Sequence, residues 1–414
     1  MTNIFFAHSG GVTSVLNGIA ASVITQAQQS PHINRIFIGR NGIIGALNNE
    51  MYDVTDFTPE MLEKLARTPA SAFGSCRYKL KCPNTQASEF ETILKHFKHH
   101  NITGFIYNGG NDSQDTTLKM HEYAQSQSQP LNCVGIPKTI DNDLPMVDCC
   151  PGYPSAAKYL ATSIYEASLD ILSMCRSSTK VFVMEVMGRH AGWLAAATAM
   201  ANTQPHLGPH IILLPEVLHN EERLIQAVKQ CVADFGCCVI AVSEGLLTAQ
   251  GKRFTDQRTT DAFGHTQLGG IAPIIAHQIH QHTGFKYHWS VVDYLQRSAG
   301  HLTSSIDHQH AIALGREAIL ALNNKLSGIM VGIHRINQSP YEWKTQYYDL
   351  KNIANIEKKL PPEFIREDQL GVTPAFKDYL RPLIQGEPIL AYRNGLPDYF
   401  TPLTIQQLRT TYAT

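Results

Sequence analysis

Long apolar runs are missing from this chain of 414 residues. The longest apolar stretch, around residues 191–201, is far shorter than the roughly 20 residues that a membrane-spanning helix needs. Residues 1–11 also lack the charged segment and the long apolar core of a secretory signal. We therefore expect a soluble, cytoplasmic protein without a membrane partner.

A charge excess of either sign is also missing. The chain has 34 basic and 35 acidic residues and a formal net charge of -1. Proteins that bind nucleic acid normally carry a basic surface, so the charge balance gives no case for a nucleic-acid partner. The nine cysteines include no Cys-x-x-Cys pair, and the nineteen histidines include no His-Glu-x-x-His pair. Reduced thiols are the favoured interpretation, ahead of a disulfide framework or a zinc site.

Two common phosphate-binding signatures are absent. The chain has no Gly-x-x-x-x-Gly-Lys-Ser/Thr loop, which disfavours a P-loop kinase. The protein-kinase combination of His-Arg-Asp with Asp-Phe-Gly is absent as a set.

The chain instead contains short apolar runs, which are followed by polar or glycine-rich clusters. These runs are rich in Val, Ile and Phe and do not alternate with polar residues, which is typical of strands buried on both faces. Segments with helical spacing lie between them, among them residues 155–175, with Ser155 as a candidate N-cap, and residues 221–234. The order of strand, polar cluster and helix predicts an α/β fold with doubly wound parallel sheets. The runs are residues 3–7, 35–38, 104–107, 132–136, 181–186, 211–214 and 239–242.

Two prolines and a glycine interrupt both periodicities at residues 149–154 and mark a domain boundary. We expect two Rossmann-like domains with parallel sheets, one from residues 1–152 with about 296–341, the other from residues 153–295. Residues 342–414, richer in proline and charge, are expected to form a C-terminal extension that packs on the core.

Two glycine-rich turns follow predicted strands. The first, residues 9–18, is expected to lead into a helix near Thr13, whose free N–H groups favour an anion. The second, residues 109–113, adds amide and carboxylate oxygens that suit magnesium bound to phosphate. Each turn alone could equally be a loop without a ligand.

A cluster of polar groups ends the run at residues 132–136. Lys138, Thr139, Asp141 and Asp143 follow one another there, at the strand end where open α/β sheets place their ligands. A lysine suits a phosphate, and an aspartate can accept a proton from a hydroxyl. The cluster therefore predicts phosphoryl transfer to an alcohol.

Further polar groups follow the strands of the second predicted domain. Gly188 and Arg189 come after residues 181–186, and Glu244 ends the run at residues 239–242. Tyr294 and Arg297 offer a phenol and a guanidinium that together suit a phosphate monoester. Taken singly, such residues are more often caps or surface groups.

Together, and in this order, the motifs resemble those of the phosphofructokinase family, from Ser9 to about Arg316. The resemblance implies a donor-binding first domain and a second domain that binds a sugar phosphate. It also implies that Asp141 is the base that takes the proton from the C1 hydroxyl of fructose 6-phosphate. The residues that would line the sugar phosphate are Thr139, Ile140, Asp141, Met187, Gly188, Arg189, Glu244, Tyr294 and Arg297.

Two positions indicate the phosphoryl donor. Asp112 and Lys138 stand where ATP-dependent members usually have glycine, so the chain resembles the pyrophosphate-dependent branch. A carboxylate in place of glycine would repel the α-phosphate of a nucleotide by roughly 4 kcal/mol at about 4 Å. That repulsion would weaken nucleotide binding by about three orders of magnitude. Lys138 would instead stabilise charge on the transferring group.

The resemblance also implies a Mg²⁺ cofactor and the residues around the donor. Gly11, Gly110, Asn111 and Lys138 would bind pyrophosphate, and Asp143 with Asn111 would organise the metal. Many relatives have aspartate in place of Asn111, so this ligand set is an open question. A homodimer or homotetramer is expected.

Two alternative functions stay open. One is an ATP-dependent 6-phosphofructokinase. The other is a catalytically silent subunit that binds sugar phosphate and regulates a partner, against which the presence of Lys138, Asp141 and Asp143 argues. The sugar could also be another phosphorylated ketose, such as sedoheptulose 7-phosphate.

Overall fold

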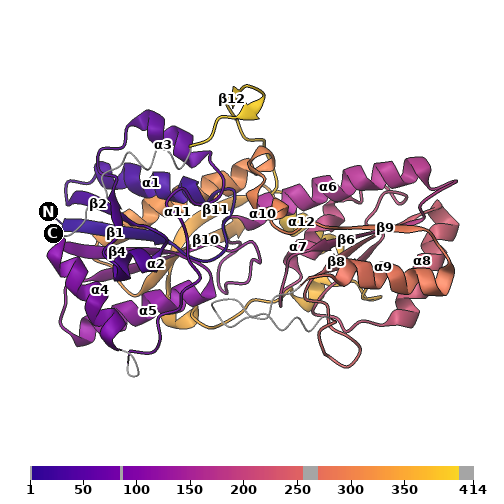
Figure 1. Ribbon diagram of the computed structural model, residues 1–414, viewed down its shortest axis with the longest axis horizontal. Helices are drawn as coiled ribbons and strands as arrows, with labels where there is room; N and C mark the ends of the chain where they lie inside the picture. The colour runs from indigo at the N-terminus through magenta and orange to yellow at the C-terminus, as the bar shows by residue number, and fades with distance from the viewer. Residues whose placement is uncertain (1, 84–86, 255–268, 401–414) are drawn as a thin grey trace. The chain divides into compact units, whose positions relative to one another are not determined.

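A computed structural model describes residues 2–83, 87–254 and 269–400. The chain divides into two compact units. The first unit comprises Met1–Gly152, Thr303–Glu357 and Gly386–Thr414, and the second comprises Tyr153–Leu302 and Lys358–Gln385. Each unit contains its own sheet, as Figure 1 shows.

The first unit is built on a seven-stranded sheet with the order β11-β10-β5-β4-β1-β2-β3. The pairs of β1 with β2 and β4, and of β5 with β4 and β10, are parallel, whereas β3 and β11 add antiparallel edges. The strands are β1 (Thr2–His8), β2 (Ile33–Gly39), β3 (Met51–Asp53), β4 (Ile102–Gly109), β5 (Asn132–Pro137), β10 (Ile329–Asn337) and β11 (Glu342–Asp349).

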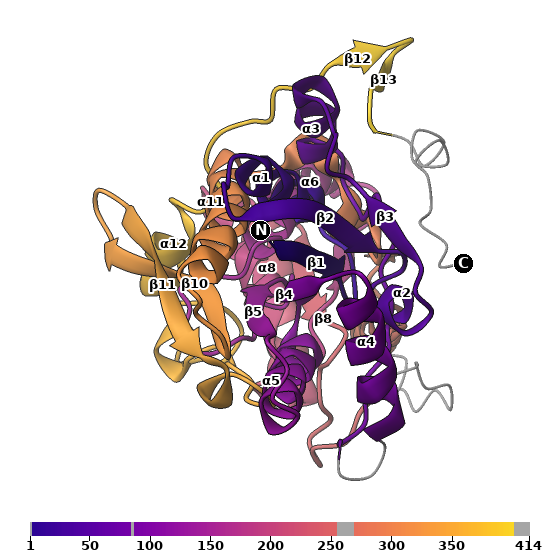
Figure 2. The same ribbon diagram turned by 90° about the vertical axis from the view of Figure 1, so that its left-hand side faces the viewer.

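Helices cover both faces of this sheet (Figure 2). Alternate residues of β1 show why: Ile4 and Phe6 join the core cluster with helices α1 and α11, and Phe5 and Ala7 join the one with α4 and α5. Because both faces are buried, the strand reads as a continuous apolar run. The helices of this unit are α1 (Leu16–Gln28), α2 (Ile43–Leu47), α3 (Pro59–Ala66), α4 (Ala87–His99), α5 (Asn111–Ser126) and α11 (Ser305–Asn323), with a 3-10 turn η3 (Leu350–Asn352).

The second unit has a four-stranded parallel sheet with the order β7-β8-β6-β9. In Figure 1, helix α6 lies on one face of the sheet and α8 and α9 on the other. The strands are β6 (Val181–Val186), β7 (Ile211–Leu213), β8 (Cys238–Ser243) and β9 (Tyr287–Val291). The helices are α6 (Tyr153–Met174), α7 (Trp193–Ala197), α8 (Glu221–Phe235), α9 (Ile271–Thr283), α10 (Leu295–Ser298) and α12 (Pro374–Leu380), with 3-10 turns η1 (Thr198–Ala201), η2 (Gly300–Leu302) and η4 (Pro362–Phe364).

The predicted α/β fold class is confirmed, and each of the seven predicted runs is a strand. Two helix starts differ from the prediction. Helix α6 begins at Tyr153, so Ser155 lies inside its first turn and is not the N-cap. Helix α1 begins at Leu16, later than Thr13. The tripeptide Asp-Phe-Gly of the protein-kinase set does occur once, at residues 234–236, at the end of α8. Gly236 is the C-cap of that helix and has a φ of 82°.

The C-terminal part of the chain is divided between the two units. The first boundary between the units lies between residues 152 and 153, and residues after 342 are grouped partly with the first unit and partly with the second. Strand β11 pairs with β10 along its whole length, so residues 342–349 complete the first sheet, and residues 350–357 belong to the same unit. Residues 358–385 belong to the second unit, where Phe376 packs beside Trp193 with ring centroids 6.4 Å apart. The segment from 386 returns to the first unit and includes the small hairpin of β12 (Tyr392–Arg393) and β13 (Leu396–Pro397).

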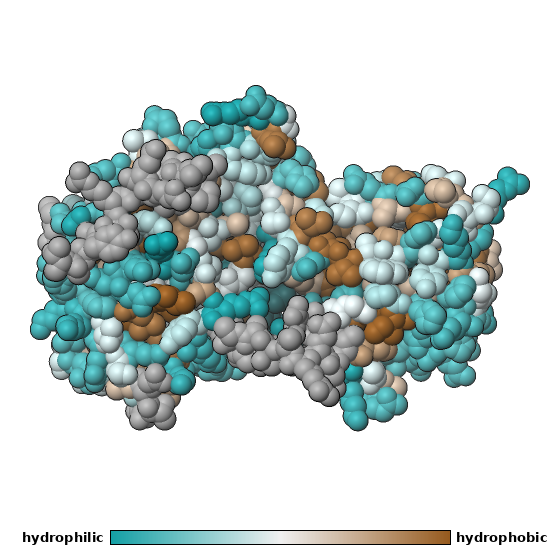
Figure 3. Space-filling view, in the orientation of Figure 1, coloured by the Kyte–Doolittle hydropathy of each residue, from teal (hydrophilic) through white to brown (hydrophobic). Residues whose placement is uncertain are grey.

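Among the described residues, no helix is both long and apolar enough to cross a bilayer. On the face shown in Figure 3, apolar residues form separate patches among hydrophilic ones.

Candidate active site

The carboxyl ends of three neighbouring parallel strands bring together the polar residues of the first unit. Strand β4 pairs with β1 and with β5, and Gly109 at the end of β4 lies opposite Pro137 at the end of β5. The Lys138 N–H continues this ladder by donating to the Gly109 carbonyl at 3.0 Å. Parallel pairing therefore places the turns after all three strands at one edge of the sheet.

Lys138 is buried, with 4% of its surface exposed, and it lies against the turn after β1. A Cβ on Gly10 would lie 3.3 Å from Lys138 Nζ, and Gly10 has a φ of 72°. Any other residue would crowd the ammonium group and strain the backbone there. The turn that contains Gly10 and Gly11 is thus shaped to accept the lysine.

A neutral histidine lies near this cation. His8, the last residue of β1, is buried, and its Nδ1 lies 3.3 Å from Asn108 Nδ2. Burial, and then the positive charge of Lys138, lower the pKa of His8 to about 3. The imidazole is therefore uncharged at neutral pH and adds no like charge beside Lys138.

Asp112 lies in the first turn of α5, whose N-cap is Gly110. Its carboxylate forms an ion pair with Lys79, with Nζ and Oδ1 2.6 Å apart. Lys79 follows a loop that is tied to the glycine turn, because Gly10 N–H donates to the Cys76 carbonyl and Ser75 Oγ donates to the Gly10 carbonyl, both at 2.8 Å. The structure thus connects Asp112 to a cation that the sequence reasoning missed.

A signal for Lys79 was present in the sequence. Residues 74–79 contain a glycine, a serine and two cations spaced two residues apart. Because no predicted strand ends shortly before this segment, Lys79 was not among the residues predicted from the strand ends.

The two predicted metal-organising residues have different surroundings. Asp143 is half-buried, two residues beyond the half-buried Asp141. The side chain of Asn111 donates to the Ile356 carbonyl and accepts from the Asn355 N–H. These bonds hold the Asn111 side chain against residues 355–356 and leave one lone pair of Oδ1 for a metal.

The turn that carries Asp141 is held by local hydrogen bonds. Asp141 N–H donates to Thr139 Oγ1 at 3.1 Å, and Thr139 forms a parallel bridge with Gly152. Asn142 has a φ of 52°, and its Oδ1 accepts from the Cys150 N–H at 3.0 Å. These bonds fix the backbone around Asp141, while Ile140 beside it is buried.

In the second unit, the polar residues again gather at the carboxyl ends of strands. Glu244 follows β8, and its N–H donates to the Val186 carbonyl at the end of β6. Gly188 N–H donates to Glu244 Oε1 at 3.4 Å, and Ser243 Oγ donates to the Gly188 carbonyl at 2.6 Å. Met187 N–H donates to Gln296 Oε1 at 3.2 Å, which connects the turn after β6 to α10.

The carboxylate of Glu244 is largely removed from water. Burial raises its pKa to about 7, although the Gly188 N–H and the charge of Arg189 act in the opposite direction. A second buried carboxylate, Glu185 on β6, accepts from Gly270 N–H and Ala272 N–H at the start of α9. Because the run at 181–186 was treated as apolar, sequence reasoning missed Glu185.

Tyr294 and Arg297 follow β9 and are in contact. The guanidinium carbon of Arg297 lies 3.9 Å from the centroid of the Tyr294 ring, a cation–π arrangement. Tyr294 is 59% exposed. The predicted residues are therefore gathered into two groups, one in each unit, and the ligand roles assigned to them stay predictions.

Comparison with known proteins gives a consistent family assignment. Residues 3–322 match the phosphofructokinase family. A protein of Methylococcus capsulatus named pyrophosphate--fructose 6-phosphate 1-phosphotransferase is 46% identical over 400 residues, covering 96% of this chain and 95% of its own length. A protein of Halomonas elongata with the same name is 48% identical over 397 residues, covering 95% of this chain and 94% of its own length.

A crystal structure of a pyrophosphate-dependent phosphofructokinase from Marinobacter aquaeolei has the same fold. It aligns with a TM-score of 0.89 at 42% identity and covers 100% of this chain and 98% of that one. The family match spans well over half of the chain, and both relatives align over nearly their full length. The chain belongs to the phosphofructokinase family.

Proposed function

We propose that this protein transfers a phosphoryl group from pyrophosphate to the C1 hydroxyl of fructose 6-phosphate. The products are fructose 1,6-bisphosphate and phosphate, and the reaction is reversible. One observation carries the donor assignment: Lys138 and Asp112 follow neighbouring strands, and Lys138 Nζ lies against the Gly10 turn. The name of the relatives at 46% and 48% identity agrees with this reaction.

Lys138 serves the transferring phosphoryl group. A buried ammonium attracts an anion more strongly than an exposed one, because little water competes with it, and the uncharged His8 adds no like charge nearby. It stabilises charge on the transferring group and on the leaving phosphate. Gly11 and Gly110 offer backbone positions without side chains at which pyrophosphate is approached closely.

Asp112 selects against nucleotides. Its pairing with Lys79 offsets part of the repulsion that a bare carboxylate would exert on an α-phosphate. The pair is partly exposed, with 39% and 25% of the two side chains accessible, so it contributes at most about 1 kcal/mol. The ion pair also holds the carboxylate in one place, which adds a steric obstacle to the electrostatic one.

Asp141 is the general base. Asp141 takes the proton from the C1 hydroxyl as that oxygen attacks the phosphorus. The hydrogen bond that fixes the backbone at Asp141 keeps its carboxylate in position. Thr139 and Ile140 line the sugar phosphate beside it.

Mg²⁺ is the proposed cofactor, and Asp143 is its main protein ligand. A half-buried carboxylate suits this hard cation, which takes oxygen ligands and keeps several waters. When bound, Mg²⁺ neutralises negative charge on the phosphates. Asn111, which is held against residues 355–356, would add the remaining lone pair of its Oδ1.

The second unit binds the sugar phosphate. Glu244 accepts hydrogen bonds from sugar hydroxyls, with Met187, Gly188 and Arg189 beside it. Arg297, stacked on Tyr294, pairs with the 6-phosphate. We also propose a cytoplasmic homodimer or homotetramer.

Asp141→Ser removes the proposed base. We expect kcat to fall at least ~100-fold while KM for fructose 6-phosphate changes little, because proton transfer and not binding is lost. Steady-state assays with pyrophosphate measure both constants. Asp56→Ser, at an exposed position in the same unit, is the control and should leave kcat unchanged. A normal kcat in Asp141→Ser would remove this assignment.

Asp112→Gly combined with Lys138→Gly restores the residues usual in ATP-dependent members. We expect kcat/KM with pyrophosphate to fall at least ~100-fold, since the donor cation is lost. The kcat/KM with ATP should itself rise at least ~10-fold, since repulsion of the α-phosphate is relieved. The two single variants separate these effects. An unchanged kcat/KM with ATP in the double variant would show that donor choice is set elsewhere.

The raised pKa of Glu244 predicts a pH-dependent KM. As the pH falls from 8 to 6, Glu244 takes up a proton around pH 7 and can no longer accept at both oxygens. We expect KM for fructose 6-phosphate to rise several-fold over this range. Glu244→Gln should have a high KM throughout and lack the change near pH 7, while keeping any change caused by the substrate phosphate. The same pH dependence in both proteins would refute the role of Glu244.

A further inference from the structure

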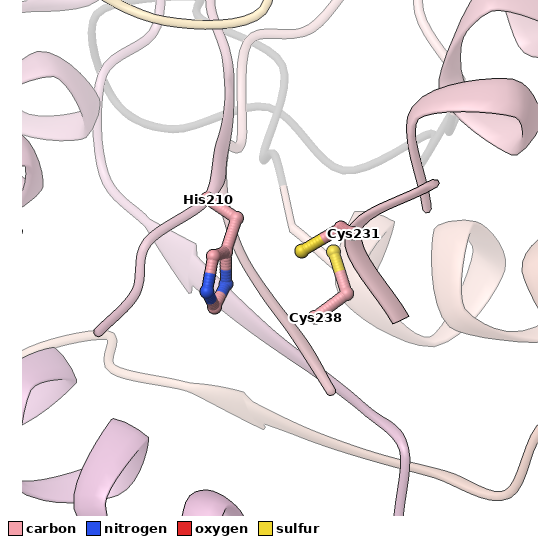
Figure 4. Close-up of side chains that lie close together, drawn as sticks. All are labelled: His210, Cys231 and Cys238. Atoms are coloured by element: carbon pink, nitrogen blue, oxygen red, sulfur yellow. The ribbon is translucent and has the colours of Figure 1, made fainter. Parts of the chain in front are cut away.

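Two cysteines and a histidine meet in the second unit, away from the proposed sugar site. They are Cys231 on α8, Cys238 at the start of β8 and His210 just before β7. One ring nitrogen of His210 and the two sulfur atoms all lie within 4.8 Å of one another. Figure 4 shows the two sulfur atoms side by side next to the imidazole ring. Glu244 follows the opposite, carboxyl end of β8.

The protonated nitrogen of the neutral His210 ring can be identified from its backbone contact. Val239 N–H donates to His210 Nδ1 at 3.0 Å, so Nδ1 is an acceptor and the ring proton is on Nε2. Nε2 is buried and has no hydrogen-bond partner within the described part of the chain. This N–H is therefore available to a negatively charged acceptor, and a thiolate at Cys231 would be one.

A His-Cys-Cys cluster can bind a metal or react through its thiols, and the tautomer of His210 distinguishes the two. A histidine that binds a metal normally donates its other ring N–H to an oxygen acceptor. Here the nitrogen bonded to the backbone accepts, so metal binding through Nε2 would need the ring to lose its only proton. The arrangement favours thiol chemistry over the metal site that the same three residues suggest.

We propose that Cys231 and Cys238 form a redox-active dithiol that a peroxide oxidises reversibly to a disulfide. A disulfide needs its sulfur atoms about 2.05 Å apart, and the two sulfur atoms already lie within 4.8 Å of each other. Cys231 is the attacking residue and is 7% exposed, whereas Cys238 is fully buried.

The environment of the two thiols supports this order of events. The hydrogen bond with Cys238, and then the proximity of His210, lower the pKa of the Cys231 thiol, against the effects of burial and of the nearby Asp234. Burial raises the pKa of Cys238 well above its usual value. Cys231 is thus the more acidic thiol of the pair. Its S–H donates to the Cys237 carbonyl at 3.3 Å, and loss of that proton gives the reactive thiolate, while Cys238 keeps its proton.

The reaction balances without any further reagent. The Cys231 thiolate attacks one oxygen of hydrogen peroxide, so an S–O bond forms and the O–O bond breaks, and hydroxide leaves as water after taking a proton. Cys238 then loses its proton and attacks the sulfenic sulfur, so the S–S bond forms and the S–O bond breaks with release of water. Two thiols are oxidised and one peroxide is reduced to two waters.

Cys175 and Cys237 form a second cysteine pair near the first, and this pair serves as an internal control. A Cβ on Gly236 would lie 3.3 Å from Cys175 Sγ, which places Cys175 beside the turn that leads to Cys237. Burial, and then the charge and hydrogen bond of Cys175, raise the pKa of Cys237 to about 12. Cys237 therefore stays protonated and is a poorer nucleophile than Cys231.

The test treats the full-length protein with graded hydrogen peroxide at pH 7, blocks free thiols after acid denaturation, and maps disulfides by mass spectrometry. We expect a Cys231–Cys238 disulfide to form first and to be reversed by a dithiol reductant.

Cys237→Ser should oxidise at the wild-type rate. His210→Phe should slow the reaction about 10-fold, because the thiolate fraction falls and the higher nucleophilicity of a less acidic thiol offsets only part of that loss. In Cys238→Ser, a sulfenic acid at Cys231 should be trapped by dimedone.

Three results would overturn the proposal, and the wild-type protein alone can give each of them. One is a Cys175–Cys237 disulfide that forms first, and another is Cys231 sulfinic acid without any disulfide. The third is one equivalent of zinc in protein purified without chelators, released as the thiols are oxidised, which would make the cluster a metal site.

Discussion

The parallel pairing of β4 with β1 and β5 is the constraint on which the donor site depends. It brings the ends of three strands to one edge, where Lys138 Nζ lies against Gly10. A buried ammonium is costly unless anions or dipoles compensate it. The uncharged His8 adds no like charge near the ammonium, and Gly10 leaves room beside it, an arrangement that suits an anionic ligand.

The same edge explains how a change at two positions can alter the donor. Asp112 and Lys138 follow neighbouring strands, so a charge added at one position acts on ligands held by the other. Lys79 links Asp112 to the loop that also supports the glycine turn. Under the proposed function, donor choice is therefore set by the connected loops after β1, β4 and β5, together with the segment at residues 74–79.

Much of this could be predicted from the sequence, because strands buried on both faces read as apolar runs. Strand β9 was missed since it is a half-exposed edge that includes His288 and Ser290, and β11 since it is an antiparallel edge. Residues 358–385 could not be assigned to the second unit, because their partners are distant in the sequence. The cluster of His210, Cys231 and Cys238 escaped for the same reason, as three elements supply it without a spacing motif.

The central claim is that pyrophosphate and not ATP donates the phosphoryl group. The most direct measurement gives the wild-type protein fructose 6-phosphate, Mg²⁺ and either labelled pyrophosphate or γ-labelled ATP, and follows label into the C1 phosphate. The account predicts kcat/KM for pyrophosphate above that for ATP by about three orders of magnitude, the value expected from ~4 kcal/mol of repulsion. Equal or faster transfer from ATP would contradict it.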